Sequence, residues 1–317
     1  MRPTISTEQT LPSGLIVEVS PWTTGDMIKM SNAGAKRLAL FGNELFGNCR
    51  VLDDPRSVYG WKADSKINGK QLLEGDRVVL AILQRILSIP DGHEFFFEFE
   101  SEDPRHRGKK TMWKLDLRRL LLPRVPDPES PNEELLAKYK MTLTDVLRRN
   151  ERDEESFLPA VIVEGLGPEP IVLGDDFCYL RPLTEEALSA FQDGNRTPFE
   201  DLDGKKLWWR QLTGEDAVNA IPESLLDREG DLLLELLSRR IVEIEGVEKK
   251  NHRNWLCQWG WGNADELFAT ISKSESGVET ELEVICSHSG RKQWHDAPLM
   301  NAAFFSQQSQ RRRSGRR

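Results

Sequence analysis

The chain has 317 residues, of which 38% are hydrophobic and 30% charged, a composition typical of a folded protein rather than a disordered one. It has no apolar run of about 18 residues and its first residues lack the apolar core of a signal peptide, so we expect no membrane span and a cytosolic location. The net charge is −9 and the last seven residues contribute +5, so the rest carries about −14, which argues against a duplex-binding surface on the folded part.

The first predicted elements are a turn, a strand, a buried helix and a hairpin. Residues 11–26, LPSGLIVEVSPWTTGD, predict a turn, a strand and the start of a helix after Thr-Gly. Residues 74–89, EGDRVVLAILQRILSI, are apolar on more than one face, which is typical of a helix buried between neighbours. Alternating apolar residues then predict a β-hairpin of 92–100 with 111–117.

The same series returns after residue 200. Residues 202–216, LDGKKLWWRQLTGED, resemble 11–26 when one residue is gapped on each side. Residues 229–244, EGDLLLELLSRRIVEI, align with 74–89 without a gap. Alternating apolar residues again predict a β-hairpin, of 277–285 with 293–299. We interpret this pattern as an internal duplication.

Four charged residues take equivalent places in the two predicted helices, and we interpret them as structural. Asp76 and Asp231 are predicted N-caps, because a carboxylate accepts the free amide protons of a first turn. Arg85 and Arg240 fall near the helix ends, where each is interpreted as a cap or a core salt bridge.

The predicted fold class is α+β, with two related units that each hold a strand, helices, a buried helix and a β-hairpin. The prolines after residue 121 indicate a linker, which continues into a helix and short strands. An added helix over 263–271 is predicted to turn Leu267, Phe268 and Ile271 inward. The predicted organisation is a first unit, the linker region, a second unit and a disordered basic tail: 1–120, 121–200, 201–305 and 306–317.

The turn CSHSG at 286–290 differs from the CxxCG of a zinc knuckle only in having a serine, Ser289, in place of the second cysteine. When the two hairpins are aligned, Cys286 falls opposite Ser101 and Ser289 opposite Pro104. Both hairpins therefore turn where a CxxC pair would sit, and neither keeps the pair.

A zinc site is not expected here, because a structural zinc needs four closed ligands. The second copy offers Cys286, His288 and His295, and Cys-x-His is a poor chelating spacing. We interpret the segment as a solvated turn with one leftover cysteine. A disulfide framework is not expected either, since no pair has CxxC spacing among the four scattered cysteines: Cys49, Cys178, Cys257 and Cys286.

The order of several short motifs resembles the T-even-type phage baseplate hub assembly family, whose members are also identified as tail assembly proteins. The resemblance covers roughly 70–120 and 200–305, and 121–200 poorly. Relatives often carry CPxCG where this chain has CSHSG, and the departure at Ser289 argues against a metal without affecting the architecture. The matching motifs are Gly75-Asp76-Arg77, Leu212-Thr213-Gly214-Glu215-Asp216, Arg240-Ile241 with Glu245-Gly246-Val247, Gly277-Val278-Glu279-Thr280, and Phe304-Phe305.

We predict no enzyme activity and no cofactor. The sequence has no Walker loop and no GxSxG, HExxH or CxxC motif. Asp175 and Asp176 lie beside Cys178, but no histidine is near in sequence to activate a thiolate.

Tryptophans are the main candidates for partner contact. Trp208 and Trp209 should point to opposite faces of a strand, so either the sheet is covered on both sides or one face binds a partner. Trp255, Trp259 and Trp261 gather near the Gly-flanked segment QWGWGN, which we interpret as a loop and the best contact candidate.

The basic tail is a second candidate for partner contact. It is polar and is predicted to be disordered. Its arginines, which include Arg311, Arg312 and Arg313, could hold nucleic acid with strong salt dependence, dock on an acidic partner, or do neither.

The resemblance implies a non-enzymatic phage tail or baseplate hub assembly protein, present in the host cytoplasm during assembly. It would contact baseplate hub or tape-measure proteins, and one form of this role is a tape-measure chaperone. Two alternatives stay open: a structural baseplate component of the virion, and a nucleic-acid-binding protein that uses the arginine tail. Nucleic acid is not expected as a partner except through that tail.

Overall fold

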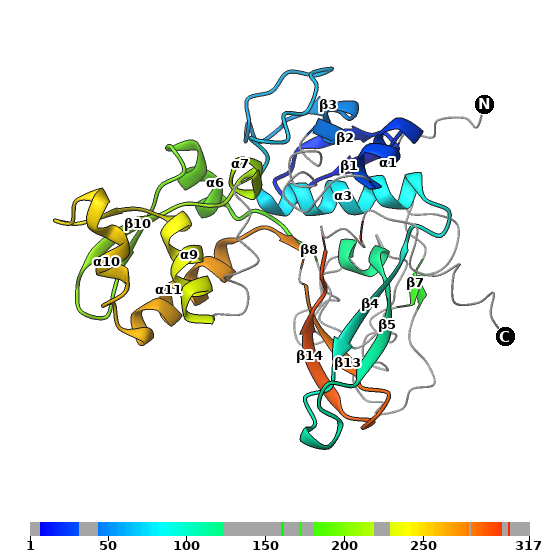
Figure 1. Cartoon of the computed structure of the whole chain (residues 1–317). Helices are drawn as coiled ribbons and strands as arrows, with labels where there is room; N and C mark the ends of the chain where they lie inside the picture. The colour runs from blue at the N-terminus through cyan, green and yellow to red at the C-terminus, as the bar shows by residue number, and fades with distance from the viewer. Residues whose placement is uncertain are drawn as a thin grey trace, which may run out of the picture.

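The computed structural model describes residues 7–31, 44–122, 160–161, 171–172, 180–218, 229–278, 280–299 and 304. Helices and antiparallel strands alternate along it, which confirms the α+β class (Figure 1). Figure 1 shows three parts: a sheet with a long helix, a protruding arm of two hairpins, and a second sheet with several helices. No helix in the described residues is long and apolar enough to cross a bilayer.

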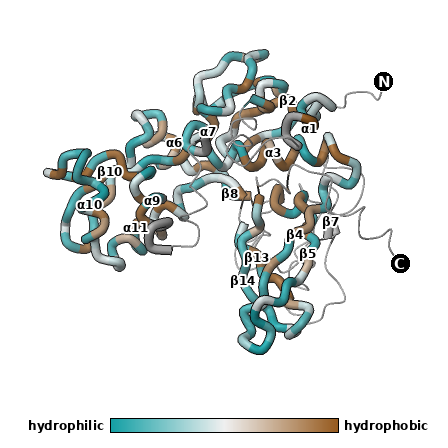
Figure 2. The backbone as a smooth tube through the Cα atoms, in the orientation of Figure 1, coloured by the Kyte–Doolittle hydropathy of each residue, from teal (hydrophilic) through white to brown (hydrophobic). Residues whose placement is uncertain are grey.

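The first sheet packs on the buried helix α3. Its antiparallel strand order is β1-β2-β3, and the strands are β1 (Thr7–Thr10), β2 (Ile16–Val19) and β3 (Arg50–Asp53). Along α3 (Glu74–Ser88) every residue from Val79 to Leu83 is buried, as expected of a helix with apolar side chains on several faces. The brown band along α3 in Figure 2 shows this apolar stretch. The neighbouring short helices are α1 (Thr24–Ser31) and η1 (Phe46–Asn48).

The arm consists of the two predicted hairpins, and both are confirmed. The first pairs β4 (Glu94–Glu100) with β5 (Lys110–Asp116), and the second pairs β13 (Glu281–Ile285) with β14 (Lys292–Asp296). The short helices η2 (Pro104–His106) and η3 (Leu117–Leu121) flank β5.

The two hairpins pack directly against each other. The Gln293 side chain donates to the Glu100 carbonyl at 2.8 Å and accepts from the Glu102 amide at 3.2 Å. The His295 ring stacks on Phe97, with centroids 5.7 Å apart. The buried residues Leu282 and Val284 therefore join the core that α3 and β4 form.

The second sheet has strand order β11-β10-β9 and its own core. Its strands are β9 (Thr197–Glu200), β10 (Lys206–Trp209) and β11 (Ile241–Ile244). Helices α9 (Glu229–Arg240), α10 (His252–Leu256) and α11 (Trp261–Ser274) supply the other core residues. Leu267 and Ile271 are buried and Phe268 packs against them, which confirms the predicted inward face of α11.

Shorter elements connect these parts. Helix α6 and the adjacent residues bury Leu183, Ala187 and Leu188 against the loop that precedes α3. Strands β8 and β12 pair with each other, as do β6 and β7. The elements are β6 (Ala160–Val161), β7 (Ile171–Val172), β8 (Leu180–Arg181), α6 (Glu185–Gln192), α7 (Gly214–Val218), η4 (Lys249–Asn251) and β12 (Gly277–Val278).

The first hairpin of each sheet has the same geometry. The two hairpins superpose residue by residue, without the one-residue gaps that the sequence comparison introduced. Thr10 pairs with Ile16 across the β1–β2 turn, and Glu200 pairs with Lys206 across the β9–β10 turn. Gly14 and Gly204 take the same turn position with φ of 95° and 78°, a conformation that favours glycine. The third strands differ in origin, because β3 precedes α3 whereas β11 follows α9.

The cores do not follow the predicted domain boundary at residue 200. The first core draws residues from both predicted units, since Val278, Leu282 and Phe304 pack with the residues around α3. The two-unit organisation and its boundaries stay a prediction.

The predicted N-cap role of Asp76 is wrong. Helix α3 begins at Glu74, so Asp76 lies inside its first turn, and its carboxylate accepts from the Ser13 amide at 3.0 Å and the Tyr59 hydroxyl at 2.7 Å. Asp76 therefore ties the helix to two loops. Helix α9 begins at Glu229, so Asp231 also lies within a first turn rather than before it.

The two equivalent arginines are both structural but make different contacts. The buried Arg85 guanidinium donates to the carbonyls of Phe304 and Glu94, and it lies over the Phe95 ring at 5.6 Å. Burial lowers the pKa of Arg85 to about 10. Arg240 instead forms an ion pair with Glu275. The predicted salt bridge thus forms at Arg240, although it is partly exposed rather than in the core, whereas Arg85 bonds to backbone carbonyls.

Candidate partner-binding surface

The turn between β9 and β10 is fastened to the start of α11 by three hydrogen bonds. The Leu202 amide donates to the Asn263 side chain at 3.0 Å, and that side chain donates to Asp203 at 2.9 Å. The indole of Trp259 donates to Asp201 at 2.7 Å. Asn263 is buried, so the two bonds that it makes are shielded from competing water.

Two large apolar side chains are exposed here, one on the turn and one at the start of α11. Trp261, the first residue of α11, is 71% exposed, and Leu202 is 67% exposed. Leu202 lies against α11 at Gly262, where an added Cβ would be 3.7 Å from its Cδ1. We call Leu202 and Trp261 the apolar pair.

The other two tryptophans of this segment pack inward, against the second core. Trp255 and Trp259 have ring centroids 5.4 Å apart, and Trp259 meets Phe199 edge to face at 6.5 Å. Both tryptophans are partly buried and pack on the second core. The predicted loop around QWGWGN therefore ends at Gly260, and Trp261 already begins a helix.

The strand tryptophans separate as the sequence predicts, but only one reaches solvent. Trp209 is fully buried in the second core, so the partner contact predicted for it is wrong. Trp208 lies on the opposite face, where the Arg196 guanidinium sits 4.5 Å from its ring centroid. Arg196 also pairs with Glu243 at 2.5 Å, so these two half-exposed side chains partly cover Trp208 on this face.

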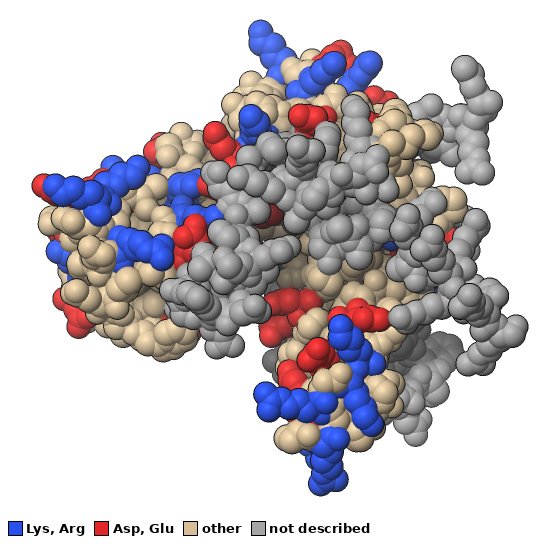
Figure 3. All heavy atoms as spheres, viewed as in Figure 1, with Lys and Arg blue, Asp and Glu red and all other residues tan. Residues whose placement is uncertain are grey.

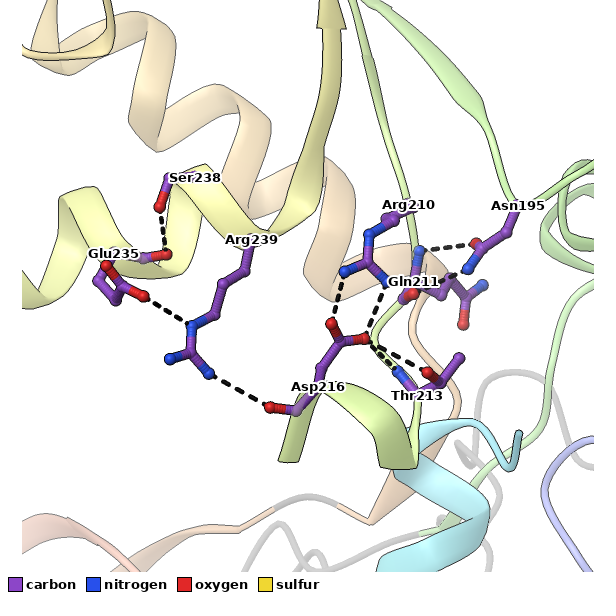
Figure 4. Close-up of polar contacts among 8 residues, drawn as sticks. All are labelled: Asn195, Arg210, Gln211, Thr213, Asp216, Glu235, Ser238 and Arg239. Atoms are coloured by element: carbon purple, nitrogen blue, oxygen red, sulfur yellow. Dashed lines mark hydrogen bonds and ion pairs between the residues drawn. The ribbon is translucent and has the colours of Figure 1, made fainter. Parts of the chain in front are cut away.

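A polar network anchored on Asp216 holds β10 and α9 to helix α7 (Figure 4). The Asp216 carboxylate receives two bonds from Arg210, at 2.5 and 2.8 Å, and one from the Thr213 amide at 2.9 Å. Its carbonyl accepts from Arg239. Burial would raise the pKa of the Asp216 carboxyl, but the bonds from Arg210 and Thr213 outweigh burial and hold the pKa below 3.8.

A cavity of about 560 Å³ opens beside this network. Tyr59 and Trp61 stack on one side of it at 4.6 Å, and Phe191 meets Tyr59 edge to face. The arginines that line the cavity are already paired, Arg210 with Asp216 and Arg196 with Glu243. Lys70 and Glu215 also line the cavity, so its charged lining has both signs and selects no single class of ligand, and we assign it none.

The turn CSHSG is exposed at Ser287, His288 and Gly290, as predicted, but its cysteine is not solvated. Cys286 has no exposed surface. Hydrogen bonds from Ser101 and Ser289 outweigh burial and lower the pKa of its thiol to about 6. The two serines that the alignment places at knuckle positions thus meet the remaining cysteine across the hairpins.

No group of three His, Cys, Asp or Glu residues in the described ranges is arranged to hold a metal ion. The absence of a metal, a cofactor and a catalytic site stays a prediction. Arg311, Arg312 and Arg313 lie outside the described residues. Sequence reasoning missed Leu202, although an apolar residue inside the polar turn DLDG is a signal that could have indicated it.

The chain matches no protein-family model, no curated protein and no solved structure.

Proposed function

We propose that this chain is a non-enzymatic assembly protein of a phage or phage-like tail, which acts through contacts with baseplate hub or tape-measure proteins. The ordered motifs that resemble the hub assembly family support the tail context. The apolar pair supports the mode of action, because its two large apolar side chains are exposed on the β9–β10 turn and at the start of α11, which three hydrogen bonds hold together.

The apolar pair has the composition of a small interface centre. Tryptophan is the residue most enriched among side chains that dominate binding energy. Because the turn is already fixed, binding costs little conformational entropy on this side of the interface.

The residues around the apolar pair favour a basic rim on the partner. Asp265 and Glu266 are exposed in α11, and Asp265 follows Trp261 by four positions and so shares its helix face. Asp203 lies on the adjoining turn. We therefore propose a partner surface with an apolar pocket for Trp261 and Lys or Arg beside it.

The proposal is tested by capturing the tagged full-length chain from cells that produce the complete tail gene cluster. We expect a hub or tape-measure protein to be captured in a fixed ratio to the chain. Capture of nucleic acid alone, or of nothing, would contradict the proposal. The chain at fixed stoichiometry in purified particles would favour the structural baseplate component over a transient chaperone.

A further inference from the structure

The end of the two-hairpin arm concentrates positive charge that the net charge of −9 conceals. The turn segments 104–110 and 287–292 hold six Lys and Arg residues and no Asp or Glu. In Figure 3 these blue side chains gather at the lower end of the arm, beyond the acidic residues along its sides. We call these two segments the basic tip.

The basic tip is one body, because side chains of one hairpin bond to the other. The Thr111 hydroxyl accepts from the Ser287 amide at 3.2 Å and lies 3.1 Å from the Ser287 hydroxyl. The His288 ring lies 3.1 Å from the Lys110 carbonyl oxygen. Cations that are far apart in the sequence are therefore presented together.

Much of this charge is not neutralised within the described residues. Arg107 and Lys109 are exposed and form no ion pair there. Arg291 lies 3.8 Å from Asp103, and Lys110 lies 3.9 Å from Glu98, so both ion pairs are long. The Arg291 and Lys110 side chains also remain more than half exposed. Solvated pairs of this kind contribute little and can exchange for a ligand anion.

The composition of the basic tip fits nucleic acid better than protein. Protein interfaces have an apolar centre and are depleted in lysine, whereas nucleic-acid interfaces are polar and strongly positive. Both turn segments are polar, and neither contains a large apolar side chain. The exposed aromatic residue Trp294 lies on the same strand face as Lys292, and such a ring provides a surface on which a base stacks.

We infer that the basic tip binds the phosphate backbone of a nucleic acid. This inference is independent of the tail-assembly function, and it places the site in the folded chain rather than in the arginine tail. Single-stranded and duplex forms share the phosphate chemistry, and exposed Trp294 favours the single strand.

The test measures binding of the full-length chain to a labelled single strand and a labelled duplex across a series of salt concentrations. To remove the contribution of the tail, all proteins carry Gln in place of the five terminal arginines: Arg311, Arg312, Arg313, Arg316 and Arg317. The tip variant adds Arg105→Gln, Arg107→Gln and Lys109→Gln. The matched control adds the same charge change at three exposed lysines elsewhere: Lys62→Gln, Lys66→Gln and Lys249→Gln.

We expect the tip variant to bind at least about tenfold more weakly, with a log–log salt slope smaller by about 2 to 3, because each phosphate contact contributes roughly one to the slope. The control should change affinity less than about twofold. Equal losses in the tip and control variants would overturn the inference. So would an absence of binding to either nucleic acid, or equal tip-dependent binding of a polyaspartate chain, which would indicate an acidic protein as the partner.

Discussion

The backbone of Gly75, in the first turn of α3, lies directly against the backbone of Gly277 in β12. A Cβ on Gly75 would lie 2.1 Å from the Ser276 carbonyl oxygen and 2.8 Å from the Gly277 Cα, and Gly277 has a φ of 136°. This contact joins the helix of the first predicted copy to the strand that leads into the second hairpin. Both glycines belong to motifs of the family resemblance, and the close approach gives a physical reason for glycine at each.

Gly75→Ala should therefore destabilise the fold. The added methyl group would overlap backbone atoms that cannot rotate away, so we expect a loss of about 2 to 4 kcal/mol in the free energy of unfolding. Gly25→Ala is a matched control, because Gly25 is also the second residue of a helix and its added Cβ meets only the Thr23 hydroxyl at 3.7 Å. Urea unfolding should show the control unchanged or more stable; a Gly75→Ala protein as stable as the control would contradict the contact.

Arg85→Ala should cost about 3 kcal/mol of unfolding free energy. The change removes a buried guanidinium and leaves the carbonyls of Phe304 and Glu94 without their donor. Arg50→Ala, at an exposed arginine of β3, should change stability by less than about 0.5 kcal/mol. Thermal unfolding compares the two variants, and equal melting temperatures would mean that Arg85 does not hold Phe304 to α3.

The Asp216 network predicts a pH dependence with a definite sign. Because the pKa of the folded carboxyl lies below 3.8, its bonds stabilise the fold fully above that value and are lost as the pH falls through the folded pKa. Asp216→Asn should cost about 2 kcal/mol at pH near 7. The difference in unfolding free energy between this variant and the wild type should shrink toward strongly acid pH. A difference that stays constant would show that the ionised carboxylate is not its cause.

The Cys286 thiol should ionise near pH 6, about three pH units below its ordinary value of 9.0. Its stabilising effect should accordingly be complete above pH 9.0 and disappear as the pH falls through 6. Thiolate absorbance in the ultraviolet should show a step near pH 6 that Cys286→Ser removes. Cys49→Ser is the control, because burial raises the pKa of Cys49 to about 11 and its loss should leave that step in place.

Local patterns in the sequence predicted the elements of the arm and of α11 well. Alternating apolar residues are enough to place a hairpin, and the spacing of Leu267 and Ile271 is enough to orient a helix. The same patterns could not show that the two hairpins pack together. The apolar faces of the two hairpins are similar, so the sequence does not show whether each hairpin packs on the helix of its own predicted unit or on that of the other unit.

The errors at single residues also arise because contacts between distant segments leave no local pattern in the sequence. An aspartate two residues into a helix has the same sequence signature as an N-cap, and only the distant partners Ser13 and Tyr59 reveal the role of Asp76. Trp208 and Trp209 are the same residue type, and the helices that pack on one face of the sheet decide which one is buried. Net charge averages over the chain, so it could not reveal the basic tip.

The central claim is that the apolar pair makes the functional contact, and one capture experiment tests it directly. The tagged wild type, a double variant with Leu202→Ser and Trp261→Ser, and a control variant with Trp294→Ser are produced with the complete tail gene cluster. The control removes an exposed tryptophan from the arm and leaves the apolar pair intact.

We predict that the wild type and the control capture a hub or tape-measure protein equally, and that the double variant binds it at least about 30-fold more weakly, as expected when an interface centre is lost. The double variant should retain the melting temperature of the wild type, because neither side chain is in the core. A folded double variant that captures the same partner as fully as the wild type would contradict the account.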